Sequence, residues 1–180
     1  MGDRDLRAVD NPILVLFDNR TITLGAWQVY EKGPVDWVAQ EVSDFIGSLG
    51  YGQMRISIKS DNENSLDSLK RLISEKRKAP TTLINSPVRE SKSNGAMEAR
   101  VKVWQSQFRT LLLDLQSCIG RRIPLGSNVV SWLVTWAATS INKYRLDKWG
   151  RTAFYRVTGS KHRRPIAKFG EHVWWIPNGH

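Results

Sequence analysis

The sequence has very few residues that could form a disulfide or a zinc site. Only one of its 180 residues is a cysteine and only three are histidines. A lone cysteine cannot form an intrachain disulfide, and with only three histidines beside it we expect no zinc site of the usual ligand count. Long apolar runs are also missing, since no segment approaches the roughly 18 residues that cross a bilayer. The first residues carry early acids and lack a signal peptide's apolar stretch. We therefore expect a soluble, non-secreted protein that binds neither zinc nor membrane.

Acidic residues are scarce in the second half of the chain. Residues 1–98 hold 13 Lys and Arg against 14 Asp and Glu, whereas residues 99–180 hold 14 against 3. The formal net charge of +10 therefore comes from the second half. Such a separation favours a polyanionic partner such as nucleic acid. Charge alone leaves a second interpretation open, in which the basic residues only keep the surface solvated.

Hydrophobic periodicity predicts strands in the first half and mainly helices in the second. This order predicts an α/β sandwich with a mixed sheet. A polar loop, residues 85–95, precedes the longest helix. The expected strands are 13–17, 22–30, 54–59 and 81–84, with a further β segment at 165–175, and the expected helices are 35–49, 64–78, 95–119, 128–142 and 151–157.

Two carboxylates lie at positions where functional groups are common in an α/β fold. Asp61 follows the strand 54–59, and Glu98 lies in the first turn of the helix 95–119. Functional groups of open α/β sheets collect at the carboxyl ends of strands. Mg²⁺ in proteins is bound through one or two carboxylates, with water and phosphate oxygens completing its shell. The plainer alternative is that Asp61 caps the next helix and Glu98 interacts with its own helix dipole.

Basic and aromatic side chains offer further candidate contacts. Lys102, Gln105 and Arg109 share one helical face with Glu98. Arg121 and Arg122, like the basic run 161–164, could contact phosphates or remain solvated. The chain also has eight tryptophans. Four of them lie at apolar positions of a periodic pattern, which favours core packing over base stacking: Trp27, Trp104, Trp132 and Trp136.

Several segments together resemble the integrase catalytic core of retroviruses and LTR retrotransposons, especially copia-like elements. The first is SDNE at 60–63, followed by SPVRESKSNGAMEARVKVWQSQFRTLL at 86–112. In that family an Asp closes a strand, and a Glu follows roughly 35 residues later in a motif like S-x-N-G-x-x-E. Here 36 residues separate Asp61 from Glu98. Residues 12–33, 132–159 and 163–175 resemble the flanking segments, so the likeness spans about 12–175.

The resemblance implies an RNase H-like fold and a DNA endonuclease and strand transferase that inserts retroelement DNA. Asp61 and Glu98 would be two of three carboxylates that hold Mg²⁺ or Mn²⁺. Asn94 and Gly95 match the loop beside the active site, and Lys102 and Gln105 match positions that face DNA. The implied partners are element-end and target DNA and further copies of the chain, in the nucleus. The implied layout is an irregular segment 1–12, a catalytic core 13–160 and a basic tail 161–180 that could start a β-barrel.

The third carboxylate departs from the family pattern. The family carries it in an apolar strand before the hairpin, but only Asp3, Asp5 and Asp10 precede Ile13, and none lies in an apolar run. We therefore expect an N-terminally truncated core whose first Asp lay upstream. The isolated chain would then have weak or no activity, which leaves open whether it is an enzyme. Two alternatives remain: an inactive DNA-binding relic of the same fold, and an RNase H-like nuclease that cuts RNA–DNA hybrids.

Overall fold

The first described element is a β-hairpin. The computed structural model describes residues 12–86, 95–164 and 167–171. Strand β1 (Ile13–Phe17) pairs antiparallel with β2 (Leu24–Gln28). The carboxylate of Asp18 organises the turn between them, because it accepts the backbone N–H of Thr21 at 2.9 Å. Ile22 has a φ of 60° and so belongs to the turn, which is why β2 begins later than predicted.

A helix and then a parallel strand pair with its crossover helix follow the hairpin. Helix α1 (Asp36–Ile46) runs into the π-helical turn η1 (Gly47–Tyr51), where Gly50 takes a φ of 88°. Strand β3 (Ile56–Ser60), helix α2 (Asn64–Arg77) and strand β4 (Thr81–Asn85) follow. Strands β3 and β4 pair in parallel, with Ser60 opposite Asn85. A parallel pair needs a long crossover, and α2 provides it.

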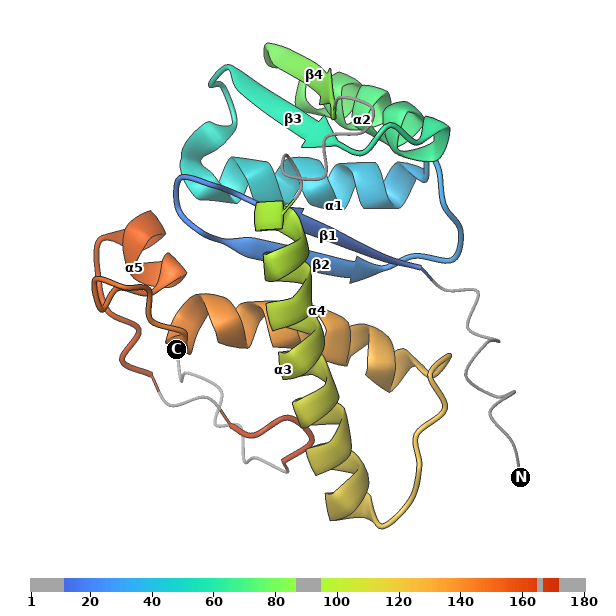
Figure 1. The fold of residues 1–180 in the computed structure, drawn as a ribbon, viewed down its shortest axis with the longest axis vertical. Helices are drawn as coiled ribbons and strands as arrows, with labels where there is room; N and C mark the ends of the chain where they lie inside the picture. The colour runs from blue at the N-terminus through green and yellow to red at the C-terminus, as the bar shows by residue number, and fades with distance from the viewer. Residues whose placement is uncertain (1–11, 87–94, 165–166, 172–180) are drawn as a thin grey trace, which may run out of the picture.

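Three helices complete the described fold (Figure 1). These are α3 (Gly95–Ile119), α4 (Asn128–Tyr144) and α5 (Ala153–Thr158). Helix α4 is fixed to the hairpin by Asn142, whose side chain bonds both the backbone N–H and the C=O of Leu24, at 2.9 and 2.7 Å. No helix among the described residues combines the length and apolar character needed to cross a membrane.

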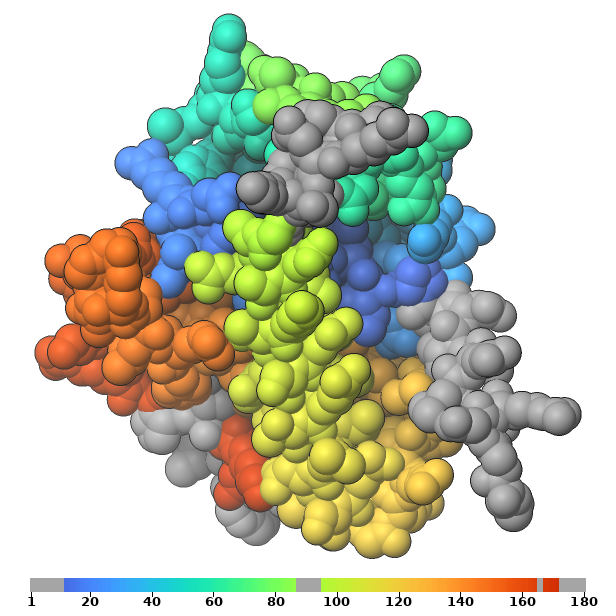
Figure 2. Space-filling view, in the orientation of Figure 1, coloured from blue at the N-terminus to red at the C-terminus, as the bar shows by residue number. Residues whose placement is uncertain are grey.

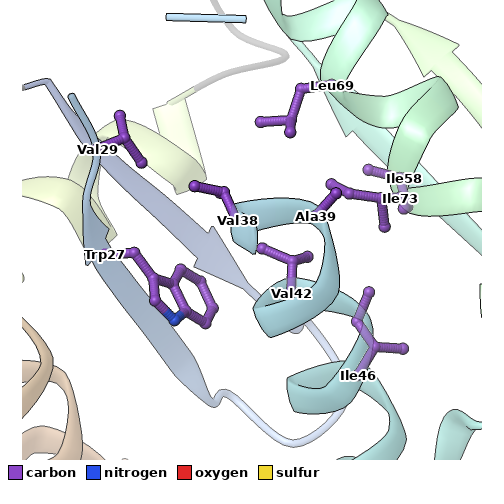
Figure 3. Packing of buried hydrophobic residues seen from close by; sticks show 9 residues of the cluster. All are labelled: Trp27, Val29, Val38, Ala39, Val42, Ile46, Ile58, Leu69 and Ile73. Atoms are coloured by element: carbon purple, nitrogen blue, oxygen red, sulfur yellow. The ribbon is translucent and has the colours of Figure 1, made fainter. Parts of the chain in front are cut away.

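The hairpin separates two hydrophobic clusters. In β2, Trp27 packs with α1, α2 and β3, whereas Leu24 and Ala26 pack with α3 and α4. Figure 3 shows the first cluster, with the Trp27 ring beside Val42 of α1. Successive strand residues point to opposite faces, so the hairpin is buried on both sides. It therefore joins the part that carries Asp61 to the part that carries Glu98.

The structure confirms the predicted α/β class with flanking helices and refines several details. The four described strands form two two-stranded sheets, one antiparallel and one parallel, instead of one sheet. Residues 167–171 form a turn, with Glu171 N–H donating to the Lys168 carbonyl at 2.9 Å, and not a strand. The rest of the predicted segment 165–175 lies outside the described residues.

Trp132 was predicted to pack in the core, and this prediction is wrong because Trp132 is 75% exposed. Trp27 and Trp104 are buried as predicted, and Trp136 is half-buried. Helix α4 buries a narrow stripe that includes Val130, Leu133 and Val134. Residue 132 falls outside that stripe at 100° per residue. The local pattern predicts burial for Trp132 because Val130 and Leu133, close to it in sequence, are buried.

Candidate metal and nucleic-acid site

Asp61 lies directly after the carboxyl end of β3, and it is exposed. Ser86, which follows β4, donates its backbone N–H to the Ser60 carbonyl at 2.9 Å. The chain therefore leaves β4 beside Asp61. The N-cap position of helix α2 is Glu63, two residues after Asp61, and the Glu63 side chain makes no capping hydrogen bond there. The Glu63 carboxylate instead accepts hydrogen bonds from Ser65 and Lys32, at 2.8 and 3.0 Å.

Glu98 is exposed in the first turn of α3. Two residues further on, the Arg100 guanidinium carbon lies 4.7 Å from the centre of the Phe17 ring, at the end of β1. This contact holds the start of α3 against the carboxyl end of the hairpin strand. A carboxylate in a first helical turn also interacts favourably with the helix dipole, so the plainer interpretation of Glu98 stands beside the functional one.

Asp61 and Glu98 would bring carboxylate oxygens to a metal from two separate parts of the fold. The described residues contain no group of three or more Asp, Glu, His or Cys placed to hold a metal ion. Two carboxylates from β3 and α3 are a donor set that Mg²⁺ accepts, because water and phosphate oxygens can fill the remaining positions. The convergence of Asp61 and Glu98 on one metal stays a prediction.

The predicted polar face of α3 is exposed. Lys102 and Arg109 are exposed and Gln105 is half-buried. The opposite side of the helix is anchored by Trp104, whose Nε1–H donates to the Val134 carbonyl at 3.2 Å. Figure 2 shows α3 open to solvent along its length on this side of the molecule. Gly95 is the exposed first residue of the helix, and Asn94 lies outside the described residues.

Arg121 and Arg122 are exposed but lie beyond the opposite end of α3. A helix of 25 residues at about 1.5 Å per residue is roughly 37 Å long. These two arginines are therefore far from Glu98 (Figure 1). The structure spreads the predicted DNA contacts along the whole helix and does not gather them at one point. A single ligand that touches all of them must be extended.

A basic pocket that the sequence analysis did not single out adjoins the start of α3. Its volume is about 570 Å³. The side chains that face it come from the hairpin turn, α3, the end of α4, the following loop and α5. They include four cations, one carboxylate and an exposed tryptophan: Arg100, Arg145, Lys148, Arg156, Asp147 and Trp149. The sequence signal was the run RLDKW at 145–149, which became meaningful only when the fold placed it beside Arg100.

Asp147 organises the loop at this pocket. Its Oδ1 accepts the backbone N–H groups of Trp149 and Arg151 at 2.8 and 2.9 Å. Its Oδ2 accepts the Nε–H of Arg156 at 3.0 Å and forms an ion pair with the same guanidinium. Burial by itself would raise the pKa of Asp147, but the hydrogen bonds from Arg156, Arg151 and Trp149 lower it from 3.8 to about 2. The carboxylate is therefore charged at neutral pH.

Comparison with known proteins identifies the fold of the chain but does not assign the chain to a family. No family model and no curated protein matches the sequence. Among solved structures, the chain is similar to the crystal structure of the catalytic core domain of BIV integrase, with a TM-score of 0.53 and 17% sequence identity. The match covers 82% of this chain and 85% of that chain. At this identity the likeness is one of fold, so the chain has the RNase H-like α/β fold found in an integrase catalytic core.

Proposed function

We propose that the chain is an integrase-type DNA endonuclease and strand transferase from a copia-like retroelement, acting in the nucleus. The observation that carries the proposal is the pair of exposed carboxylates in this fold: Asp61 at the carboxyl end of β3 and Glu98 in the first turn of α3. The similarity to the BIV integrase core supports the proposal through the fold that it shares. Its substrates would be element-end DNA and a target duplex.

Asp61 and Glu98 would hold Mg²⁺ or Mn²⁺ through their carboxylate oxygens, the donors that these hard cations prefer. The bound metal would supply activation of an attacking oxygen and stabilisation of the leaving oxygen in phosphodiester chemistry. The protein's own part is to position DNA. Lys102, Gln105 and Arg109 line the same face of α3 as Glu98, and Asn94 and Gly95 precede that face. Arg121 and Arg122 extend the contact to a longer duplex.

The charge balance of the second half supports a DNA partner. Its only acids are Asp114, Asp147 and Glu171. Asp114 forms an ion pair with Lys168 at 2.9 Å, and Asp147 pairs with Arg156. Glu171 accepts the backbone N–H of Lys168 at 2.7 Å. These acids are therefore engaged near their own partners, which leaves the cations of α3 available to neutralise phosphates.

The chain would also act as a homo-oligomer. Trp132 is 75% exposed and Val129 is 42% exposed, and both lie on one face of α4 because they are three residues apart. Large exposed apolar side chains on one face are typical of protein contacts. Sedimentation velocity tests this: the wild-type chain should sediment as an oligomer, and Trp132→Glu should shift it to monomers. A monomeric wild-type chain would contradict the proposal.

The central test is a joining assay with element-end duplex, target duplex and Mg²⁺ or Mn²⁺. We expect weak, metal-dependent joining that Asp61→Asn and Glu98→Gln both remove. Glu41→Gln, which changes an exposed carboxylate on α1, is the matched control and should leave joining intact. Because the activity is expected to be weak, Mn²⁺ binding followed by electron paramagnetic resonance is a second readout, and both site variants should weaken it.

Three outcomes would overturn the proposal. Joining or Mn²⁺ binding that is unchanged in Asp61→Asn and Glu98→Gln would remove these residues from the site. Metal-dependent cutting of an RNA–DNA hybrid without joining of DNA ends would favour the RNase H-like nuclease. DNA binding without any Mn²⁺ binding would favour the inactive relic.

A further inference from the structure

We infer that the pocket between α3, α5 and the loop 145–149 binds an unpaired nucleotide of a DNA strand. Its cations would contact the phosphate, and Trp149 would stack on the base. The inference deepens the proposed function, because it rests on DNA as the partner, but it needs neither a metal nor the two carboxylates. It adds a site that distinguishes a single strand from a duplex.

The charge of the pocket selects an anionic ligand. Arg100, Arg145, Lys148 and Arg156 all line it, and Asp147 is the one acid among the lining residues. The Asp147 carboxylate already accepts hydrogen bonds from Arg156 and from two backbone N–H groups. It therefore neutralises little beyond Arg156, and the other three cations face the pocket with positive charge in excess. A phosphate is the anion that such a group of arginine and lysine side chains binds well.

The rest of the pocket selects an aromatic group. Trp149 is 64% exposed, although a large apolar side chain is usually buried. The guanidinium carbon of Arg156 lies 5.3 Å from the centre of the Trp149 ring, and the ammonium of Lys148 lies 4.3 Å from it. Arg156 is anchored by Asp147, whereas the exposed Lys148 side chain can move aside from the ring. A base that stacks there would also lie close to cations.

An apolar floor completes the pocket. Leu24, Val103 and Ile141 also line it, and Leu24 and Ile141 are buried. A volume of about 570 Å³ lies within the range of pockets that hold ligands the size of a nucleotide. A free inorganic anion would leave both this floor and the Trp149 ring unused. A nucleotide, which carries a phosphate and a planar base, uses all three features.

The same features favour an unpaired nucleotide over a duplex. Bases inside a duplex are stacked on one another, so a duplex presents mainly its phosphates to a protein side chain. It could meet the arginines but could not reach Trp149 with a base face. Single strands offer every base for stacking, and aromatic side chains in a basic groove are how proteins bind them. Arg100 also lies two residues from Glu98, so one strand can span the polar face of α3 and the pocket.

Asp147 is the positioning residue of this site. It would not touch the nucleotide, because its oxygens are used to hold the N–H groups of Trp149 and Arg151 and the side chain of Arg156. These bonds fix the loop before a ligand arrives. A preformed loop reduces the entropy lost on binding.

The test is fluorescence anisotropy with a labelled short oligothymidylate in the absence of divalent metal. We expect the oligothymidylate to bind more tightly than a duplex of equal length. Trp149→Ala should weaken its binding by roughly fivefold to a hundredfold, the range for losing one base stack. Trp149→Phe should keep most of the affinity. Trp37→Ala, which removes another exposed tryptophan on α1, is the matched control and should bind as the wild type does.

The charged side of the pocket has its own test. Arg100→Gln and Arg145→Gln should each lower the salt dependence of oligothymidylate binding by about one unit, as expected when one phosphate contact is lost. The control is Arg55→Gln, which changes an exposed arginine before β3 and should leave the salt dependence of binding unchanged. A salt dependence that falls equally in all three variants would contradict a local site.

A crosslinking experiment guards against loss of folding in the variants. Ultraviolet crosslinking of the wild-type chain to a bromodeoxyuridine oligonucleotide should modify the peptide that contains Trp149. Crosslinks confined to other peptides, or unchanged oligothymidylate binding by Trp149→Ala, would overturn the inference. Mn²⁺ binding that Asp61→Asn and Glu98→Gln leave unchanged, with Trp149-dependent binding intact, would overturn the proposed function alone. Intact joining without Trp149-dependent binding of oligothymidylate would overturn the inference about the pocket and leave the proposed function standing.

Discussion

The first and second parts of the described chain use charge in opposite ways. In residues 12–86 cations are paired across elements: Lys76 of α2 contacts Asp36 of α1 at 2.6 Å, and Lys32 contacts Glu63 at 3.0 Å. In residues 95–164 acids are few, and cations line α3 and the pocket at Trp149. The contrast teaches that the first part uses its charges to hold elements together, whereas the second part leaves an excess of cations on its surface.

Buried cations sharpen the contrast. Lys70 and Arg77 are 4% and 7% exposed, and both lie on α2 in the first part. Lys70 donates to the Ile84 carbonyl at 3.1 Å and pairs with Asp67 at 2.9 Å. A buried charge must be paired or hydrogen-bonded to be tolerated. These two cations are therefore structural, unlike the exposed ones on α3.

Removal of Arg77 should have the largest effect on stability. Its Nη2 donates to the carbonyls of Tyr51 and Met54 at 2.8 and 3.1 Å, and Arg77→Met would leave both carbonyls without this donor. We expect a loss of about 3 kcal/mol in the free energy of unfolding, measured by urea titration. Arg71→Met, at an exposed position of the same helix, should change it by less than about 0.5 kcal/mol. Equal losses in the two variants would break the comparison.

Neutralising cations in the second part should change binding and not stability. The double variant Lys102→Gln and Arg109→Gln should weaken duplex binding roughly tenfold and lower its salt dependence by about two units. Its unfolding free energy should stay within about 0.5 kcal/mol of the wild type. The control is Arg55→Gln with Arg71→Gln, which removes the same charge from the first part. If that control weakened DNA binding as much, the second part would have no special role.

Acid should loosen the pocket loop only at strongly acidic pH, because the pKa of Asp147 is depressed. The pKa of Asp147 is about 2 in the folded chain and 3.8 ordinarily, so its stabilising charge is fully present above about pH 4 and is lost as pH falls through about 2. The indole N–H signal of Trp149 should shift over that window in nuclear magnetic resonance spectra. Asp147→Asn should abolish the shift. A midpoint above pH 5 would contradict the hydrogen-bonding account of Asp147.

The smallest effect is expected from the ion pair between α1 and α2. Asp36 is an exposed partner of Lys76, and exposed pairs contribute little because solvent screens them. Asp36→Asn should lower the unfolding free energy by no more than about 0.5 kcal/mol in the urea titration. A loss as large as that of Arg77→Met would mean that surface pairing, and not burial, distinguishes the first part.

Sequence patterns predicted the elements well where a helix is long and strongly periodic. Helix α3 runs over Gly95–Ile119, as its apolar stripe and the preceding polar loop indicated. Strand β3 and helix α2 also lie where predicted, which places Asp61 at a strand end. These signals are local, because periodicity depends on which face of one element is buried.

Features that depend on distant contacts could not be predicted. The periodicity of the hairpin does not show that β2 is buried on both faces, because that follows from α4 packing on it through Asn142. Trp132 has the same local pattern as buried tryptophans. The pocket requires Arg100 and Trp149 to meet, and 48 residues separate them in sequence. Such meetings come from tertiary packing and leave no short-range signal.

Paramagnetic broadening by Mn²⁺ tests the central claim most directly, because it reports whether one cation lies near both acids. We expect the backbone amide signals of Asp61 and Glu98 to broaden together at the same Mn²⁺ concentration, and both effects to weaken in Asp61→Asn. Broadening at one residue alone, or broadening at Glu98 that is unchanged in Asp61→Asn, would show that the two carboxylates do not share a metal.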